Sequence, residues 1–402
     1  MAKPGEFSII LKLLAGLVLG ALLGFVINEP VMVVMVSIRH ILGQIIFFLV
    51  PLVILGFITP ARIRLGQNAS KILMFAVALA YVSSVGAAIF SMTSGYIIIP
   101  HLSVATEHES LTKLPDMVFR LDIPPLFSVM SALIMALFTG LGIAWTKAKV
   151  MADLFAEFEK VVSWLVTNVM IPILPFFVGL CFMGLAYDGS LTQHLPVFVT
   201  MVIIVIIGQF IWLAVLYGIG GLVSGRNPSQ VFRYYVPAYL TAVGTMSSAA
   251  TLPVSLACAR RSPVLSSTAV EFMVPLGATV HLCGSVLTET FFVMTISQML
   301  YGAIPSLGTM LLFCILLGIF AVGAPGVPGG TVVAALGIVT GVLGFDQTGV
   351  ALLIAIFALQ DSFGTACNVT GDGALTLILD GVFNRNGELG PLQHSDTGAS
   401  HA

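Results

Sequence analysis

Long apolar segments recur along the whole chain, and they constrain its fold more than any other feature. Eight of them approach or exceed the length of about 20 residues that a helix needs to cross a bilayer. They lie near residues 7–27, 41–59, 71–99, 124–146, 158–183, 195–222, 265–299 and 348–380. Only 8% of the 402 residues are charged, against about 25% in a soluble domain, so lipid must cover the surface. The sequence therefore predicts an all-α integral membrane protein.

The first apolar segment carries Gly16, Gly20 and Gly24 at four-residue spacing, which is typical of a close-packing face on a membrane helix. It lacks a small-residue cleavage site, so we expect a retained helix rather than a signal peptide.

The net charge of −2 argues against a nucleic-acid partner. The five cysteines stand singly without Cys-x-x-Cys spacing, so neither disulfides nor zinc are expected. We expect the polar tail from Asn384 to be disordered.

Two further apolar segments, near residues 229–259 and 302–345, are interrupted by sequences unlike a plain membrane helix. The first is broken by the polar run 245–251 and the second by the Gly/Pro-rich run 323–330. Such backbone is tolerated at membrane depth only where protein or a water-filled cavity satisfies its N–H and C=O groups. We therefore expect two re-entrant helical hairpins in addition to the eight transmembrane helices.

Basic residues predict the orientation, because cytoplasmic loops carry an excess of Lys and Arg. Most of them fall in loops that alternate to one side, whereas Arg39, Lys113 and Arg120 fall on the other. The majority side should be cytoplasmic, with both termini inside. Four arginines bracket the first hairpin, but no Lys or Arg occurs from Ser262 to Asn384, so the second hairpin should open outward. Hairpins that enter from opposite faces indicate the inverted repeats of a transporter.

The hairpin breaks are the first candidate sites. Ser247 and Ser248 offer hydroxyls and free backbone N–H groups that suit a carboxylate at half-helix N-termini. The alternative for this pair is an ordinary helix cap. The second break, at residues 323–330, can close as a gate and present backbone groups to a substrate or ion, or it can simply separate two spans.

A Gly-bracketed polar stretch at residues 277–285 lies inside the seventh span. It predicts local unwinding that exposes carbonyl groups to a cation. His281 is either a proton carrier, because imidazole titrates near neutral pH, or a neutral histidine bonded between helices. Cys283 is expected to pack rather than react. Glu271 and Glu289 in the same span are acids for which the sequence identifies no partner.

The eighth span carries the strongest polar cluster. From Asp361, steps of four, seven and eleven residues place Thr365, Asn368 and Asp372 on one helical face. Buried carboxylates are costly unless they are paired, and no Lys or Arg lies near them in the sequence. The stripe therefore predicts a site for cations or ammonium groups.

Four signatures resemble, in order and spacing, those of the dicarboxylate/amino acid:cation symporter family of glutamate transporter homologues. They are residues 247–253, 275–279, 326–329 and 368–372, whereas the N-terminal third resembles the family only in helix count. The resemblance implies a homotrimer of elevator-type transporters. The scaffold would comprise residues 1–70 and 100–194, the moving transport domain residues 71–99 and 195–383, and the disordered tail residues 384–402.

The resemblance also implies roles for individual residues. Ser248 and nearby amides would hold the α-carboxylate of an amino acid, and Asp361 would hold its ammonium group. The substrate-binding residues it implies are Ser247, Ser248, Ser285, Val327, Pro328, Gly329, Asp361, Gly364, Thr365 and Asn368. The ion-binding residues, counting backbone oxygens and His281 as a proton carrier, are Gly277, Thr279, His281, Leu282, Ala321, Val322, Gly323, Asn368 and Asp372.

Departures from the family pattern bear on substrate and ion. Gly364 stands where members that carry acidic amino acids have Arg, and Met246 replaces an Arg of some members. A second carboxylate would enter unpaired, so the sequence predicts a small neutral substrate such as serine, threonine or alanine. The alternative is an acidic amino acid or dicarboxylate with proton coupling.

The ion sites also differ from the family. Residues 281–285 replace the motif Asn-Met-Asp-Gly-Thr and lose an acidic ligand, and residues 75–80 lack the expected Tyr, Thr and Ser. We expect fewer than three sodium ions, or proton coupling through His281, in a transporter of the cell's inner (plasma) membrane. Two other interpretations stay open: a channel-like pathway on the same fold, and an intramembrane hydrolase using Ser247 or Ser248, which the missing nucleophile-elbow glycines disfavour.

Overall fold

The computed structural model describes residues 4–67, 71–102, 114–324 and 329–384, and these residues form helices and no strands. The first half contains α1 (Pro4–Gly24), α2 (Glu29–Gln67), α3 (Lys71–Ile98), η1 (Ile99–His101), α4 (Val129–Thr146) and α5 (Lys149–Leu165). A π-helical turn, η2 (Val166–Met170), joins α5 to α6 (Ile171–Tyr187) without a break, so the expected fifth span is continuous.

The second half contains α7 (Ser190–Ser224), α8 (Ser229–Thr245), α9 (Ser248–Arg261), α10 (Ser267–Val280) and α11 (Cys283–Tyr301). It ends with α12 (Leu307–Gly323), α13 (Gly330–Gly341) and α14 (Gln347–Asn384). Both interrupted segments form the expected helix–tip–helix units, since α8 packs on α9 and α12 on α13. The expected seventh span is α10 and α11, broken at His281 and Leu282.

Six helical segments of the described chain are long and apolar enough to cross a membrane, which makes this a multi-pass membrane protein. The expected first and fourth spans contain shorter apolar helices, Ala15–Gly24 and Ile134–Thr146. The fourth begins later than predicted because residues 114–128 are not helical: Pro124 and Pro125 lack the N–H groups that a helix interior needs. The second begins earlier than predicted, at Glu29.

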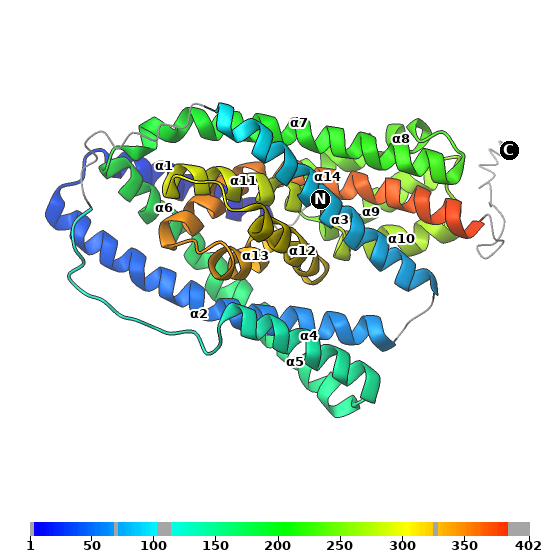
Figure 1. Cartoon of the computed structure of the whole chain (residues 1–402), viewed down its shortest axis with the longest axis horizontal. Coiled ribbons are helices and arrows are strands. Elements are labelled where there is room, and N and C mark those ends of the chain that lie inside the picture. The colour runs from blue at the N-terminus through cyan, green and yellow to red at the C-terminus, as the bar shows by residue number, and fades with distance from the viewer. Residues whose placement is uncertain (1–3, 68–70, 103–113, 325–328, 385–402) are drawn as a thin grey trace.

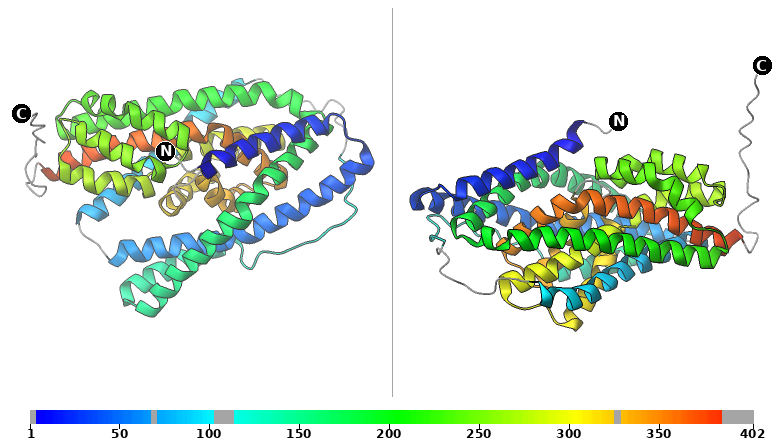
Figure 2. Two further views of the ribbon diagram at one scale, coloured as in Figure 1. Left: turned by 180° about the vertical axis from the view of Figure 1, so that it is seen from behind. Right: turned by 90° about the horizontal axis from the view of Figure 1, so that it is seen from above.

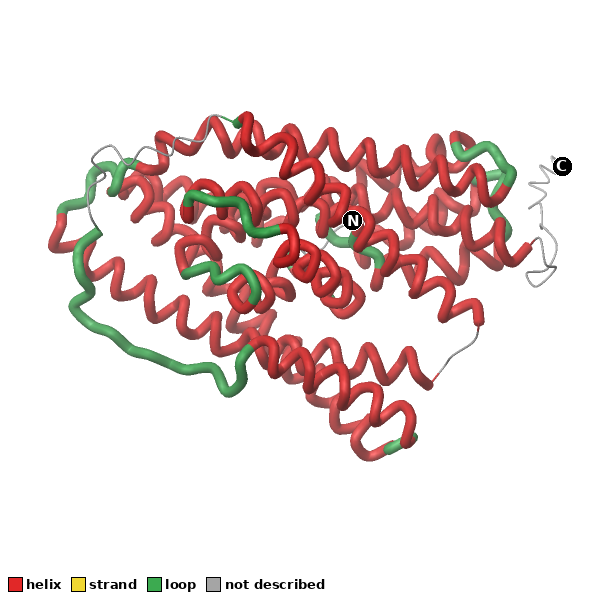
Figure 3. The backbone as a smooth tube through the Cα atoms, in the orientation of Figure 1, coloured by secondary structure: helices red, strands yellow, loops and turns green. Residues whose placement is uncertain are grey.

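Helix α14 is the centre of the molecule. It contacts α3, α7, α8, α9, α10, α11 and α13. In Figure 1, α7 and α8 lie along one edge, α2, α4 and α5 lie along the opposite edge, and the other hairpin helices, α9, α12 and α13, lie between them. Residues 114–128 run as an extended segment beside α2 (Figure 3), where the backbone N–H of Val118 bonds Ser37 and that of Ile123 bonds Gln44.

The predicted glycine face of α1 is confirmed. Gly16, Gly20 and Gly24 lie directly against backbone atoms of Pro175, Gly179 and Met183 on α6, so a side chain at any of the three would clash. Figure 2 shows α1 running alongside α6 in the view from behind. Small residues at this spacing allow two membrane helices to bring their backbones into contact.

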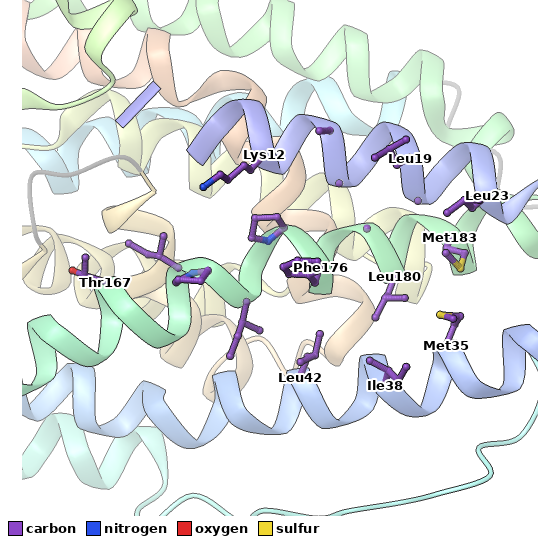
Figure 4. Close-up of a pocket in the computed structure, with 18 residues that line it drawn as sticks. Lys12, Leu19, Leu23, Met35, Ile38, Leu42, Thr167, Phe176, Leu180 and Met183 are labelled. Carbon is purple, nitrogen blue, oxygen red and sulfur yellow. The ribbon is translucent and has the colours of Figure 1, made fainter. Parts of the chain in front are cut away.

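An apolar groove of about 1220 Å³ lies between α1, α2 and α6 (Figure 4). Among the described residues that line it, Lys12 carries the one charge, and the others are residues such as Leu19, Phe176 and Leu180. These residues include no carboxylate that could bind an ammonium group or a cation. The apolar lining therefore suits lipid tails or another membrane helix rather than a polar solute.

Candidate functional site

Buried polar side chains gather where α14 meets α10 and α11, with α3 and α7 beside them. The predicted stripe of α14 is confirmed as buried: Asp361, Thr365, Asn368 and Asp372 are all almost inaccessible. Ser285, Thr288 and Glu289 of α11 are also buried, and α11 packs directly on α14. The site is therefore a polar seam between two helices inside an apolar protein.

Asn368 holds the break between α10 and α11 in place. Its Oδ1 accepts hydrogen bonds from the backbone N–H groups of Gly284 (2.7 Å) and Ser285 (3.2 Å). Its Nδ2 donates to Ser285 Oγ at 2.9 Å. The first N–H groups of a helix have no partner within it, and Asn368 supplies one for α11. This structural use was not expected, and it leaves the Asn368 side chain only its second amide hydrogen for a ligand.

Asp372 lies beside the break and contacts His281. Asp372 Oδ1 is 2.9 Å from His281 Nδ1, and the other ring nitrogen, Nε2, is 2.9 Å from Ser83 Oγ on α3. A Cβ at Gly277 would lie only 2.5 Å from Asp372 Oδ1, so the carboxylate packs against bare backbone. Of the two interpretations of His281, the structure matches the histidine bonded between helices; it does not test proton transfer.

The contribution of α3 differs from the expectation. The family pattern has polar residues at positions 75–80, where this chain has none. Ser83 and Ser84 lie one turn further along α3 and are buried. Ser83 reaches His281 directly. A shift of one helical turn in an apolar helix leaves little trace in the sequence, because the flanking residues are interchangeable.

Asp361 connects α14 to the tip of the second hairpin. Its Oδ2 accepts a hydrogen bond of 2.8 Å from the backbone N–H of Gly329, which adopts a left-handed conformation with φ of 71°. Thr365, one turn further along, also interacts with this carboxylate. Val327 and Pro328 lie outside the described residues, so the structure does not place them.

The tip of the first hairpin is held by its own hydroxyl groups. Ser247 caps α9 by accepting a hydrogen bond of 3.2 Å from Ala250 N, and the hydroxyls of Thr245 and Thr251 are 2.7 Å apart. The cap that was the alternative for the serine pair is therefore correct for Ser247. Ser248 is the first residue of α9 and is buried.

The residues expected to hold a second ion by their backbone lie on neighbouring elements, since α10 contacts α12. The Leu282 carbonyl accepts from Val286 N, and the Ala321 carbonyl accepts from Ala324 N, but each carbonyl oxygen has a second lone pair. Val322 is buried, and the backbone of Gly323 lies close to Ile58 of α2. The Thr279 side chain is exposed and bonds Leu276 O, so only its backbone suits this role.

Two other acids differ from the expectation. Glu271 was taken as an acid without an identifiable partner, but its side chain is 61% exposed and 3.4 Å from Arg260 Nη2. Sequence reasoning also missed Asp380, which pairs with Arg226 and accepts hydrogen bonds from Ser266 N (3.0 Å) and Ser266 Oγ (2.8 Å). Its position two turns after Asp372 on the buried stripe was the available signal.

No group of three His, Cys, Asp or Glu side chains that could hold a metal ion occurs among the residues placed by the structure. A sodium site needs no such group, because hard cations bind carbonyl and carboxylate oxygens. The seam offers Asp372, the backbone of the α10–α11 break and the ends of the hairpin helices. This arrangement can hold one ammonium group at Asp361 and a small cation near Asp372.

The sequence pattern of the sodium:dicarboxylate symporter family matches residues 9–382. The chain belongs to this family, which confirms the resemblance. The family is one of transporters rather than enzymes.

The chain is also similar to curated amino-acid transporters. Excitatory amino acid transporter 2 of Homo sapiens is 31% identical over 243 residues, which cover 58% of this chain and 42% of the relative. Serine/threonine transporter SstT of Acinetobacter baylyi is 32% identical over 186 residues, which cover 44% of this chain and 46% of the relative. The alignments thus span less than half of either relative.

Proposed function

We propose that this protein is a secondary active symporter of a small neutral amino acid, such as serine, threonine or alanine, coupled to sodium. One observation carries the proposal: Asp361 is buried in the seam, pairs with no Lys or Arg among the described residues, and bonds the tip of the second hairpin through Gly329. A carboxylate in this setting needs a positive partner, and the ammonium group of a substrate provides one that comes and goes.

The remaining contacts follow from the chemistry of an amino acid. Its ammonium group would bind Asp361, with Thr365 alongside. Its carboxylate would accept hydrogen bonds at the start of α9, where Ser248 and free N–H groups favour an anion. The bond between Asp361 and Gly329 links occupancy of this site to the position of the second hairpin, as a gate requires.

Gly364 favours a neutral substrate. A Cβ built at Gly364 would have Ser285 Oγ at 3.5 Å and Gln360 Oε1 at 3.6 Å as neighbours. No guanidinium is available there to pair with a second carboxylate, and an unpaired buried charge is strongly unfavourable. The family's description includes dicarboxylates and the name of one relative includes serine and threonine, so an acidic amino acid or dicarboxylate carried with protons is the second candidate.

Sodium would travel as a co-substrate. Asp372, the Gly277 carbonyl and the backbone of Asn368 would form one site, and the backbones near Thr279, Leu282 and residues 321–323 a second. His281 already contacts Asp372, which supports fewer than three sodium ions and leaves a coupled proton as the alternative. The family resemblance supports a homotrimer with an elevator motion of residues 71–99 and 195–383. The distribution of basic residues supports cytoplasmic termini in the plasma membrane.

Transport into sealed vesicles tests this proposal. Purified protein in proteoliposomes should concentrate labelled serine, threonine or alanine under an inward sodium gradient, and Asp361→Ala should abolish the uptake. Glu271→Gln, which changes an exposed acid outside the site, serves as the matched control. Uptake that persists in Asp361→Ala would contradict the site, and concentration of aspartate driven by a proton gradient would favour the second candidate.

A further inference from the structure

Glu289 has no role in the contacts described so far. It lies on α11 one turn beyond Ser285, is 0% exposed, and neither carboxyl oxygen has a hydrogen-bond partner among the residues that the structure places. It interacts electrostatically with Asp361 on α14. A buried carboxyl group without a partner is unfavourable, so a group that joins it only part of the time would explain its presence beside the substrate site.

Gln360 leaves a second buried polar atom unpaired. The Thr288 hydroxyl has Gly284 O at 2.8 Å, Gln360 Oε1 at 2.8 Å and Gln209 Nε2 at 3.0 Å. A hydroxyl has one hydrogen and can donate to only one of the two oxygens. If the Gln360 amide turns over, its Nε2 donates to Thr288 and its Oε1 loses its partner; otherwise Nε2 has none. In either orientation one polar atom of Gln360 stays free.

The absence of a side chain at Gly364 leaves space beside these groups. Gly364 lies one turn after Gln360 on α14, and a Cβ there would make only ordinary van der Waals contacts with Ser285 and Gln360. The Ser285 hydroxyl accepts a hydrogen bond from Asn368 and keeps its own hydrogen to donate. The Gly364 position is therefore bordered by a donor, Ser285, and by the Gln360 amide, and Glu289 lies one turn beyond Ser285 on the same face of α11.

We propose that Glu289 and Gln360 form a side-chain subsite that selects an uncharged substrate side chain with both a donor and an acceptor, such as a hydroxyl or a carboxamide. The inference rests on the proposed function, because it takes the ammonium group to sit at Asp361. An apolar side chain would leave both groups unpaired, and an anionic one would face Glu289. A cationic one would satisfy Glu289 but not an amide N–H of Gln360.

Isosteric pairs of amino acids test the subsite directly. Affinities of the full-length protein in detergent with sodium would be measured by isothermal titration for threonine against valine and for asparagine against leucine. We expect the polar member of each pair to bind at least about tenfold more tightly, because a site built for hydrogen bonds rejects an isostere that lacks them. Equal affinities within the pairs would overturn the proposal.

Two variants assign the preference to the named residues. Glu289→Gln and Gln360→Leu should each reduce the discrimination within the pairs to about threefold or less while valine still binds, because shape is kept and one partner is lost. Gly364→Ala narrows the same space while both residues keep their own side chains, and it should weaken asparagine more than alanine. Glu271→Gln is the control and should leave every affinity unchanged.

Several outcomes separate this inference from the proposed function. Unchanged discrimination in Glu289→Gln, together with a shifted pH dependence of transport, would assign a proton to Glu289 and overturn the subsite. Lysine binding more tightly than asparagine would assign a cationic substrate and also overturn it. Loss of binding for all amino acids in Asp361→Ala, with altered discrimination in Glu289→Gln, would support both. Binding that survives Asp361→Ala, with discrimination still reduced in Glu289→Gln, would count against the ammonium site at Asp361 but not against the subsite.

Discussion

The middle and the C-terminal end of α14 both bury carboxylates, but the partners of these carboxylates differ. At the end, Asp380 pairs with Arg226 and accepts two further hydrogen bonds from Ser266. In the middle, Asp361 accepts a hydrogen bond from Gly329 N and has no basic partner among the described side chains. Burial is almost complete in both places.

This difference separates structural acids from functional acids. A permanent counter-charge makes Asp380 part of the packing between α14, the α7–α8 connection and the start of α10. A carboxylate without one is free to bind a cation that enters and leaves. The permanence of the counter-charge, rather than burial itself, therefore distinguishes Asp361 from Asp380 and supports the role proposed for Asp361.

The largest effect is expected for Asp361→Ala. Amino-acid affinity should fall at least about 100-fold, because losing one partner of a buried charge pair costs roughly 2–5 kcal/mol. The melting temperature without substrate should hold or rise, since an unpaired buried acid has been removed. Titration calorimetry and thermal unfolding measure the two quantities, and a large loss of stability would place Asp361 with Asp380 instead.

Arg226→Met should break the structural pair. The Asp380 side chain is 0% exposed and that of Arg226 23%, so removal of the cation should destabilise the protein by about 3–5 kcal/mol. Substrate affinity of the folded fraction should not change. The double variant Arg226→Met/Asp380→Leu should recover much of the melting temperature, and no recovery would show that Arg226 stabilises through other contacts.

Gly364→Arg tests whether a fixed cation in the middle of α14 changes the substrate preference from neutral to acidic amino acids. Affinity for aspartate or glutamate should rise about tenfold, as a guanidinium pairs with the second carboxylate. Competition against labelled serine measures the change. Gly364→Leu adds bulk without charge and should give no such gain; an equal gain in both variants would contradict the electrostatic explanation.

Ser83→Ala should have a moderate effect on stability. It removes the hydrogen bond between Ser83 and His281 Nε2, which is worth about 0.5–1.5 kcal/mol. The choice among substrates should stay the same, because His281 faces Asp372 rather than Asp361. A changed ranking of amino acids in a competition assay would extend the substrate site toward α3.

Glu271→Gln is expected to have the smallest effect of these substitutions on stability and uptake. Its pair with Arg260 lies between two exposed side chains, and such surface pairs contribute less than about 1 kcal/mol. Melting temperature and uptake should both match the unsubstituted protein. A measurable loss of uptake would show that burial is not required for an acid of this region to matter.

Features with a period or a break along the chain could be predicted from the sequence. The polar stripe from Asp361 to Asp372, the glycine face of α1 and the two hairpin breaks all have a local pattern. The polar partners of buried and exposed groups have no such local pattern. Ser83 meets His281, and Arg226 and Arg260 meet their acids, only after distant segments pack together. Glu271 and Glu289 look alike in the sequence, yet one is exposed and the other fully buried.

The contact between α1 and α6 has a consequence for biosynthesis. The ribosome completes α1 early, whereas α6 emerges only after α2, α4 and α5. Until then Gly16, Gly20 and Gly24 present a bare strip of backbone to lipid or to the insertion machinery. Docking of α1 is therefore a late step of assembly, and a bulky residue at Gly20 would leave the first helix inserted but detached.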